Sequence, residues 1–347
     1  MFVPGLELSR RLYTEAVRPL LARHFPALAH SAALIGAGSE VLGFDTERST
    51  DHDWGPRLQL FLGTDHSEVE ALLRERLPST FGGYPLIPIA GERRHGLVVA
   101  ELGDWLTGRL GFDPTGPITT VDWLATPTQT LAELTHGVVH HDGLGRLHAV
   151  RRSLAWYPDD VWRYLLACQW QRIGQEEAFV GRCGEVGDEL GSTVVAARLV
   201  RDLMRLCLLM GRTYPPYGKW LGNAFARLPD ARLTPTLRSV LTATTWHDRE
   251  RQLTVAYEAV ARRHNELGLT PPVDAHVRPF HSRPFLVLHA ERFVGALMES
   301  VTDPAIRSLP LTGGIDQFVD NTDVLEHHSR CRSITAAVHT PIKGEPW

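Results

Sequence analysis

Residues 36–62 read GAGSEVLGFDTERSTDHDWGPRLQLFL, and this stretch decides how the first part of the chain folds. A glycine-rich turn stands at its start. At its end every second residue from Leu58 to Leu62 is a leucine, which is the alternation of a strand with one buried face. Asp51 and Asp53 stand just before that face, separated by one histidine. Because two carboxylates this close repel each other, the sequence predicts that a cation lies between them.

The two aspartates have the spacing of a magnesium site. Side chains two residues apart on a strand point to the same face, about 6 to 7 Å apart, so Asp51 and Asp53 can aim at one point. Mg²⁺ prefers oxygen ligands and is usually completed by waters and substrate phosphate oxygens. Two such ions can hold the attacking and leaving oxygens of a phosphoryl displacement. We therefore expect two Mg²⁺ ions, with a nucleoside triphosphate such as ATP as substrate.

Gly38 and Ser39 fit the same chemistry. A glycine lets the backbone approach a phosphate closely, and a serine hydroxyl with loop amides can donate hydrogen bonds to phosphate oxygens. Eleven residues separate Ser39 from Asp51, enough for a loop that leads from one strand to its neighbour. Arg57 follows Asp53 at the fourth position and is either a further phosphate contact or part of the polar side of the strand.

The pair GS at 38–39 followed by DHD at 51–53 resembles the signature of the DNA polymerase beta-like nucleotidyltransferase superfamily. This resemblance implies a small mixed sheet, two aspartates that hold Mg²⁺, a third carboxylate on a later strand and, in many members, a helical bundle after that domain. The same stretch, with YLLACQWQRIGQEEAFVGRCGE and YPPYGKWLG, also resembles bacterial proteins grouped as domain of unknown function family 4037, over most of the chain. That family brings no known substrate.

The expected third carboxylate is Glu101. In GLVVAEL, residues 96–102, Leu97, Val99 and Glu101 share one face of a predicted strand, so Glu101 could act as a metal ligand or as general base for the acceptor hydroxyl. Asp104 is the alternative. If neither acid reaches the metals, the protein would bind a nucleotide without transferring it.

Two sites in the second half are candidates for substrate contacts. Lys219, in YPPYGKW, stands beside aromatic residues at the predicted start of a helix, and the resemblance implies that it contacts the triphosphate; otherwise it is a surface lysine. Glu176 and Glu177 either bind a cationic acceptor or belong to a solvated helix face, with Arg172 and Arg182 as their expected ion-pair partners.

The chain has the pattern of an α+β protein with two domains. Its 347 residues exceed the usual size of one hydrophobic core. Strands and helices alternate up to residue 152, where 137–150 is predicted to form a hairpin, and long helical patterns dominate from 153 to 325. We expect a small mixed-sheet nucleotidyltransferase domain over 1–152, a helical bundle over 153–325 and a flexible tail over 326–347.

Composition limits the partners. A net charge of -4 gives no general attraction to nucleic acids or to anionic membranes, so a small-molecule acceptor is expected. Four cysteines without a CxxC pair fit a reducing cytoplasm, and Cys168 and Cys207 are expected to pack in the core. No secretion signal or apolar span of membrane length is present in the sequence. A cytoplasmic protein is therefore predicted.

The predicted reaction is the attack of an acceptor hydroxyl on the α-phosphate of the triphosphate, with release of pyrophosphate. Two alternatives remain at this point. The acceptor could be the hydroxyl of a protein, as in toxin-associated minimal nucleotidyltransferases, or the chain could be a nucleotide sensor without catalytic activity.

Overall fold

The structure is a computed structural model that describes residues 2–51, 54–63, 66–87 and 96–340. The chain divides into two compact units, which are taken separately below. The first comprises residues 1–122 and 128–156, and the second comprises residues 123–127 and 157–347. The assignment of Trp123–Pro127 to the second unit was not predicted; it follows from the packing of the buried Trp123 ring against Tyr157, with 5.4 Å between the ring centroids.

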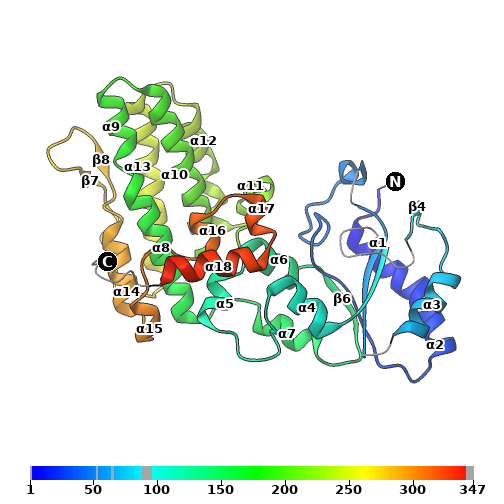
Figure 1. Ribbon diagram of the computed structural model, residues 1–347. Helices are drawn as coiled ribbons and strands as arrows, with labels where there is room; N and C mark the ends of the chain where they lie inside the picture. Colours follow the sequence, from blue (N-terminus) through cyan, green and yellow to red (C-terminus); the bar gives the residue numbers. More distant parts are fainter. Residues whose placement is uncertain (1, 52–53, 64–65, 88–95, 341–347) are drawn as a thin grey trace. The chain divides into compact units, whose positions relative to one another are not determined.

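The first unit is built on a four-stranded sheet with the order β5-β2-β1-β6 (Figure 1). The β1 strand pairs antiparallel with both β2 and β6, whereas β2 and β5 are parallel. The sheet is therefore mixed, as predicted. The strand bounds are Ser31–Leu34 for β1, Arg57–Leu62 for β2, Gly96–Glu101 for β5 and Val138–Asp142 for β6.

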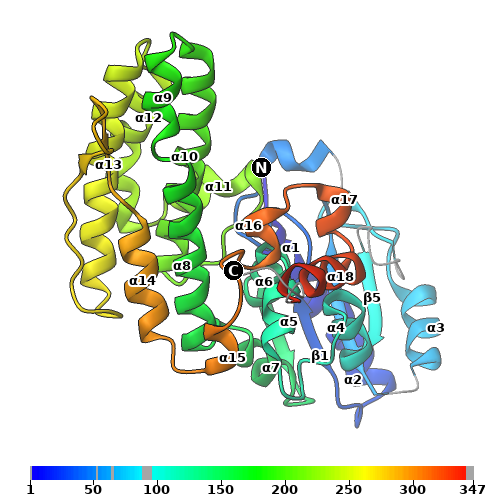
Figure 2. The ribbon, with the colours of Figure 1, turned by 60° about the vertical axis from the view of Figure 1, so that its left-hand side comes forward.

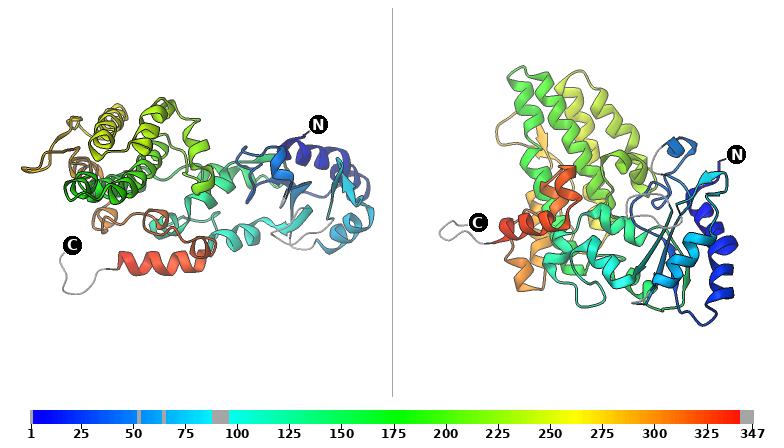
Figure 3. Two further views of the ribbon diagram at one scale, coloured as in Figure 1. Left: turned by 90° about the horizontal axis from the view of Figure 1, so that it is seen from above. Right: turned by 45° about the vertical axis from the view of Figure 1, so that its right-hand side comes forward.

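Helices pack on both faces of this sheet. The alternating leucines of β2 belong to one core cluster with Leu12 of η1 and Leu73 of α3. Figure 3 shows the ribbons of the N-terminal helices and of α3 beside the sheet. On the opposite face Phe61 contacts the Trp105 ring of α4 edge-on, with 5.4 Å between centroids. The elements involved are α1 (Gly5–Arg11), the π-helical segment η1 (Leu12–Val17), α2 (Arg18–His24), α3 (Ser67–Arg76) and α4 (Leu102–Leu110).

The remaining elements of the first unit are short. They are η2 (Glu47–Asp51), β3 (Thr80–Phe81), β4 (Tyr84–Pro85), α6 (Thr128–Thr135) and α7 (Leu147–Ser153), and α5 (Thr120–Ala125) crosses into the second unit. The predicted hairpin over 137–150 is wrong in its second half, which is helix α7. The Asp142 carboxylate accepts hydrogen bonds from the N–H groups of Leu147 and His148, at 3.4 and 2.9 Å, and so starts a helix where a second strand was expected.

The second unit is almost entirely helical. Its long helices α8, α10 and α13 lie side by side, with α10 in contact with the other two (Figures 1 and 2). The bounds are α8 (Asp159–Glu176), α9 (Phe179–Glu185), α10 (Glu189–Met210), α11 (Gly218–Phe225), η3 (Pro229–Leu233), α12 (Thr234–Thr242), α13 (Trp246–Glu266), β7 (Arg278–Pro279), β8 (Leu286–Val287), α14 (Glu291–Ser300), α15 (Pro304–Arg307), α16 (Ile315–Phe318), α17 (Thr322–Leu325) and α18 (His328–His339).

Aromatic packing joins three of these helices. The fully buried Trp170 of α8 stacks on Phe293 of α14 at 4.5 Å between centroids, and its Nε1–H donates to Nδ1 of His264 on α13 at 3.2 Å. Cys168 and Cys207 are buried, which confirms their predicted place in the core. Among the described helices, none combines the length and the apolar character needed to cross a membrane.

The prediction of a flexible tail over 326–347 is wrong for residues 328–339, which form helix α18. Cys331 and Thr335, four residues apart, are both fully buried on one side of it, and the Cys331 thiol donates to the Val324 carbonyl at 3.3 Å. Cysteine and threonine are weak markers of a buried helix face, so the pattern was overlooked. Residues 341–347 lie outside the described part.

Candidate functional site

The GAGSE loop, residues 36–40, lies at one end of the sheet of the first unit. It follows β1 directly, and the register of the antiparallel pair places Ala33 opposite Gln59. The end of β1 therefore meets the start of β2. Side-chain contact reinforces this arrangement, because Gln59 Oε1 accepts a hydrogen bond from the N–H of Ile35 at 3.0 Å.

A buried ion pair ties the loop to β2. Arg57 Nη1 lies 2.8 Å from Oε1 of Glu40, whose side chain is only 1% exposed. The second Arg57 amino group donates to the carbonyl of Ala37. Burial raises the pKa of Glu40 and the charge of Arg57 opposes this rise. Arg57 therefore holds the loop in place, which is a different role from the phosphate contact considered from the sequence.

Gly38 is required by the shape of this loop. Its φ of +140° lies in the region that favours glycine, and a Cβ atom there would come within 2.7 Å of both Arg57 Nη1 and Glu40 Oε2. The backbone at Gly38 thus passes directly over the ion pair. Ser39, next in the chain, is partly exposed.

The structure brings Ser39 close to the segment that carries Asp51. Ser39 Oγ lies 3.5 Å from Ser49 Oγ in η2, and the Ser39 carbonyl accepts from the N–H of Phe44 at 2.8 Å. Asp51 is exposed at the end of η2. Asp53 lies outside the described residues, but Trp54, which follows it, is buried and its indole N–H donates to Asp45 at 3.3 Å. The chain is therefore anchored on both sides of the aspartate pair.

Glu101 is not brought to this end of the sheet. In the parallel pair of β2 and β5, Gly96 is opposite Arg57 and Glu101 is opposite Leu62, so Glu101 lies at the far end, about 16 Å along the strands. Leu97 also packs in the core cluster on the face opposite Arg57. The strand face that Leu97, Val99 and Glu101 share is therefore the apolar face of the sheet.

Glu101 has a local role in the structure. It caps α4 by accepting from the N–H of Asp104 at 2.9 Å, and it pairs with Arg146 Nη1 at 2.9 Å. Burial raises its pKa, but the bonds from Asp104 and Arg146 outweigh this effect and hold the pKa of Glu101 below its usual value. Asp104, the alternative, stands in the first turn of the same helix and shares this position at the far end.

Lys219 lies in the second unit. It is exposed in the first turn of α11, and its ammonium group lies 4.9 Å from the centre of the Trp220 ring. Such a contact orients the side chain at a small gain in free energy. The helix start predicted at this lysine is confirmed, and its contact with a triphosphate stays a prediction.

The adjacent acids Glu176 and Glu177 have different surroundings. Glu176 pairs with Arg198 on α10, where one N–O distance is 3.0 Å, and not with Arg172 or Arg182 as expected. Glu177 is buried, and its two oxygens accept from the N–H groups of Leu288 and Ala290, at 2.7 and 3.0 Å. Glu177 therefore fixes the loop before α14. The alternative that Glu177 lies on a solvated helix face is wrong.

We expect Glu177 to make the stability of the second unit depend on pH. Burial raises the pKa of Glu177 from 4.5 to about 7, against the two backbone donors, so the folded state binds a proton more tightly than the unfolded state. The resulting stabilisation is complete below pH 4.5 and is lost as the pH rises through about 7.

Urea unfolding of the wild type and Glu177→Gln from pH 5 to 7.5 measures this effect. The difference in free energy of unfolding should change by up to about 3 kcal/mol over that range. Glu176→Gln, which alters an exposed ion pair, is the matched control. A difference that stays constant with pH would contradict the assignment.

Two charged groups at the GAGSE loop were not predicted from the sequence. One is Glu40, whose importance follows only from its burial against Arg57. The other is Arg109 on α4, whose guanidinium lies against Gly36. Glu40 directly follows the GS pair, but the sequence does not show that its carboxylate is buried. Arg109 has no spacing relation to the GS and DHD pairs, because helix α4 and the loop meet only in the folded chain.

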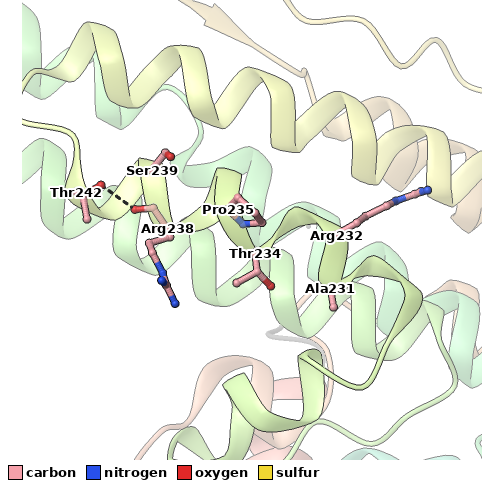
Figure 4. A pocket seen from close by; sticks show the side chains of 7 residues that line it. All are labelled: Ala231, Arg232, Thr234, Pro235, Arg238, Ser239 and Thr242. Carbon is pink, nitrogen blue, oxygen red and sulfur yellow. Dashed lines mark hydrogen bonds between the residues drawn. The ribbon is translucent and has the colours of Figure 1, made fainter.

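A depression of about 640 Å³ is lined by residues of α12 and η3 in the second unit (Figure 4). Arg232, Arg238 and Ser239 are among the side chains at its rim. The described residues that line it carry no carboxylate, so it does not have the ligands of the predicted magnesium site. In the part of the chain that the structure describes, no group of three histidine, cysteine, aspartate or glutamate side chains is arranged to hold a metal.

One known family matches part of the chain. Residues 123–221 match the family described as Domain of unknown function (DUF4037). This stretch runs from the end of α5 through α6, β6, α7, α8, α9 and α10 into α11. No curated protein and no solved structure matches. The chain therefore resembles the DUF4037 family over this stretch, which lies outside the GAGSE loop and the aspartate pair.

Proposed function

We propose that this protein is a Mg²⁺-dependent nucleotidyltransferase that moves a nucleoside monophosphate from a nucleoside triphosphate to the hydroxyl of a small molecule. The observation that carries the proposal is the meeting of the GAGSE loop and the Asp51 segment at one end of a small mixed sheet, where Ser39 lies beside Ser49. A phosphate-binding loop next to paired carboxylates is the arrangement that phosphoryl transfer requires.

The residues present fit a magnesium site in two respects. Asp51 is an exposed carboxylate at the end of η2, a 3-10 helix and not the strand expected from the sequence, and Asp53 stands two residues later in the sequence. The positive φ of Gly38 and its lack of a Cβ let the loop turn tightly over the Arg57–Glu40 pair, which fixes the shape in which the loop would present its amides to a phosphate. Asp51 and Asp53 would hold the metal, which when bound supplies charge stabilisation for the transferring phosphoryl group.

The protein's own groups have separate roles in this proposal. Gly38 and Ser39 hold phosphate oxygens through the loop amides and the serine hydroxyl, and Arg57 with Glu40 keeps the loop in its shape. The net charge of -4 supports a small-molecule acceptor over nucleic acid.

The test is pyrophosphate release from each of the four ribonucleoside triphosphates, with Mg²⁺ and cell extract as the source of acceptor. We expect one or more nucleotides to support release. Chelation of Mg²⁺ with EDTA should abolish it, because the metal supplies the positive charge that joins the aspartates to the phosphate oxygens, and added Mg²⁺ should restore it. Release that is insensitive to EDTA would contradict the role of the aspartates.

A specific observation favours a second candidate, a nucleotide sensor without transfer activity. Glu101 and Asp104 both lie at the far end of β5, so neither supplies the third carboxylate that the resemblance implies. Mg²⁺-dependent nucleotide binding without pyrophosphate release would support this sensor. A stable protein partner that carries an added nucleotide would instead support a protein hydroxyl as acceptor.

A further inference from the structure

Helix α10 of the second unit carries an apolar stripe on a face that is exposed to solvent. Leu190 is 77% exposed and Val194 is 54% exposed, and the exposed Ala197 follows on the same face. Val186, in the turn between α9 and α10, is 80% exposed and adds to the apolar surface at the start of the helix. Because soluble proteins seldom expose several apolar side chains together, this stripe indicates a binding surface.

The opposite side of α10 belongs to the helical bundle. Helices α8, α9 and α13 pack against α10 (Figure 2), and Ser192, Ala196 and Leu199 are buried there. The exposed residues from Leu190 to Ala197 recur at intervals of four and three positions, and Arg201 follows after four more. This is the repeat of a coiled-coil seam, along which one helix packs against another. The partner that fits the stripe is therefore a second helix.

The two ends of the stripe differ in charge. At its start, the exposed Asp188 caps α10 by accepting a hydrogen bond from the N–H of Gly191 at 2.7 Å. Toward its other end, the partly exposed Arg201 lies 3.7 Å from Asp202 and 3.6 Å from Asp320, which are distances of loose ion pairs. Two antiparallel copies of α10 bring the acidic start of each stripe to the basic end of the other, whereas parallel copies place like charges together. The stripe is thus complementary to itself.

We propose that two copies of this chain associate through α10, with the two helices antiparallel about a two-fold axis. Val194 then faces Ala197 of the partner subunit. Leu190 faces Arg201 of the partner subunit, whose aliphatic stem covers the leucine while its guanidinium reaches Asp188. A two-fold contact uses the same patch on both copies, which a self-complementary stripe supplies. This dimer goes beyond the proposed function and is independent of it.

Sedimentation velocity of the full-length protein at about 1 to 200 µM tests the contact, and we expect a concentration-dependent dimer. Val194→Glu should raise the dissociation constant of the dimer about 100-fold or more, because two carboxylates would be buried in the seam without partners. Val255→Glu on α13 is the matched control, since Val255 is 51% exposed, and it should dimerise as the wild type does. Circular dichroism confirms that each variant is folded.

Charge reversal tests the antiparallel order. Arg201→Glu alone and Asp188→Lys alone should each weaken the dimer about 10-fold, because each variant brings like charges together at both ends of the contact. An equimolar mixture of the two variants should restore the dimer, since every reversed charge then meets an opposite one. Parallel helices would not give this result, because like residues would face each other in the wild type and in each single variant.

The outcomes decide the inference without reference to nucleotide chemistry. A wild type that stays monomeric over the whole concentration range overturns the dimer. A dimer that Val194→Glu leaves intact, or that Val255→Glu weakens equally, also overturns it, because the contact then does not depend on the stripe of α10. A mixture that fails to restore association overturns the antiparallel order. The proposed function is measured separately, by pyrophosphate release.

Discussion

Replacement of Asp53 with asparagine is expected to lower the rate of pyrophosphate release by on the order of 10²-fold or more, because one of the two carboxylates that hold Mg²⁺ is lost. Asn keeps the size of the side chain and removes its charge. Asp51→Asn should have an effect of the same order, since Asp51 is exposed and its replacement leaves the core intact. Turnover is measured by pyrophosphate release under saturating triphosphate.

Glu101→Gln is the informative comparison for these two variants. The register of β2 and β5 puts Glu101 five residues beyond the end of the sheet where the GAGSE loop lies. Turnover of Glu101→Gln should therefore stay within a few-fold of the wild type. Retained turnover in Asp53→Asn would overturn the assignment of the aspartate pair, and a collapse in Glu101→Gln would show that the expectation from the sequence was right.

Replacement of Arg57 with methionine is expected to destabilise the first unit by about 3 kcal/mol, because Glu40 then stays buried without its partner. The loop carbonyl of Ala37 also loses its donor. Urea unfolding followed by circular dichroism measures the loss. Arg10→Met, which removes an exposed ion pair with Glu7, is the matched control and should cost less than about 1 kcal/mol.

A double-mutant cycle with Glu40→Gln separates the ion pair from simple packing. If the pair acts as a unit, the combined variant should be destabilised by clearly less than the sum of the two single changes. Additive effects would mean that Arg57 and Glu40 act independently. The cycle also reports on function, because displacement of the loop should weaken MgATP binding together with stability.

Local patterns in the sequence were sufficient for the strands β1, β2 and β5, but not for the second strand of the predicted hairpin, which is helix α7. The alternating leucines of β2 identified the buried face correctly, and the apolar run before Gly36 is β1. The site was harder, because it depends on how strands pair. Glu101 was predicted as the third carboxylate only from the strand face on which it lies. The parallel register with β2 shows that Glu101 is at the end of β5 remote from the GAGSE loop.

The groups that the sequence did not reveal are brought together by the fold. Glu40 and Arg57 are 17 residues apart, and Arg109 stands 73 residues after Gly36 in the sequence. Neither separation along the sequence matches the spacing of neighbours within one helix or strand, so no local pattern could suggest these contacts. Helix α18 was missed for a different reason, since its buried positions carry cysteine and threonine instead of large apolar residues.

The short segment Trp123–Pro127 has a consequence for how the chain folds during synthesis. It belongs to the second unit, although residues 128–156 return to the first, so the chain enters the second unit twice. When Trp123 leaves the ribosome, Tyr157 has not yet emerged, and the indole ring cannot reach its final partner. Domains usually fold in the order of their synthesis. Here the second unit can be completed only after the chain has passed back through the first.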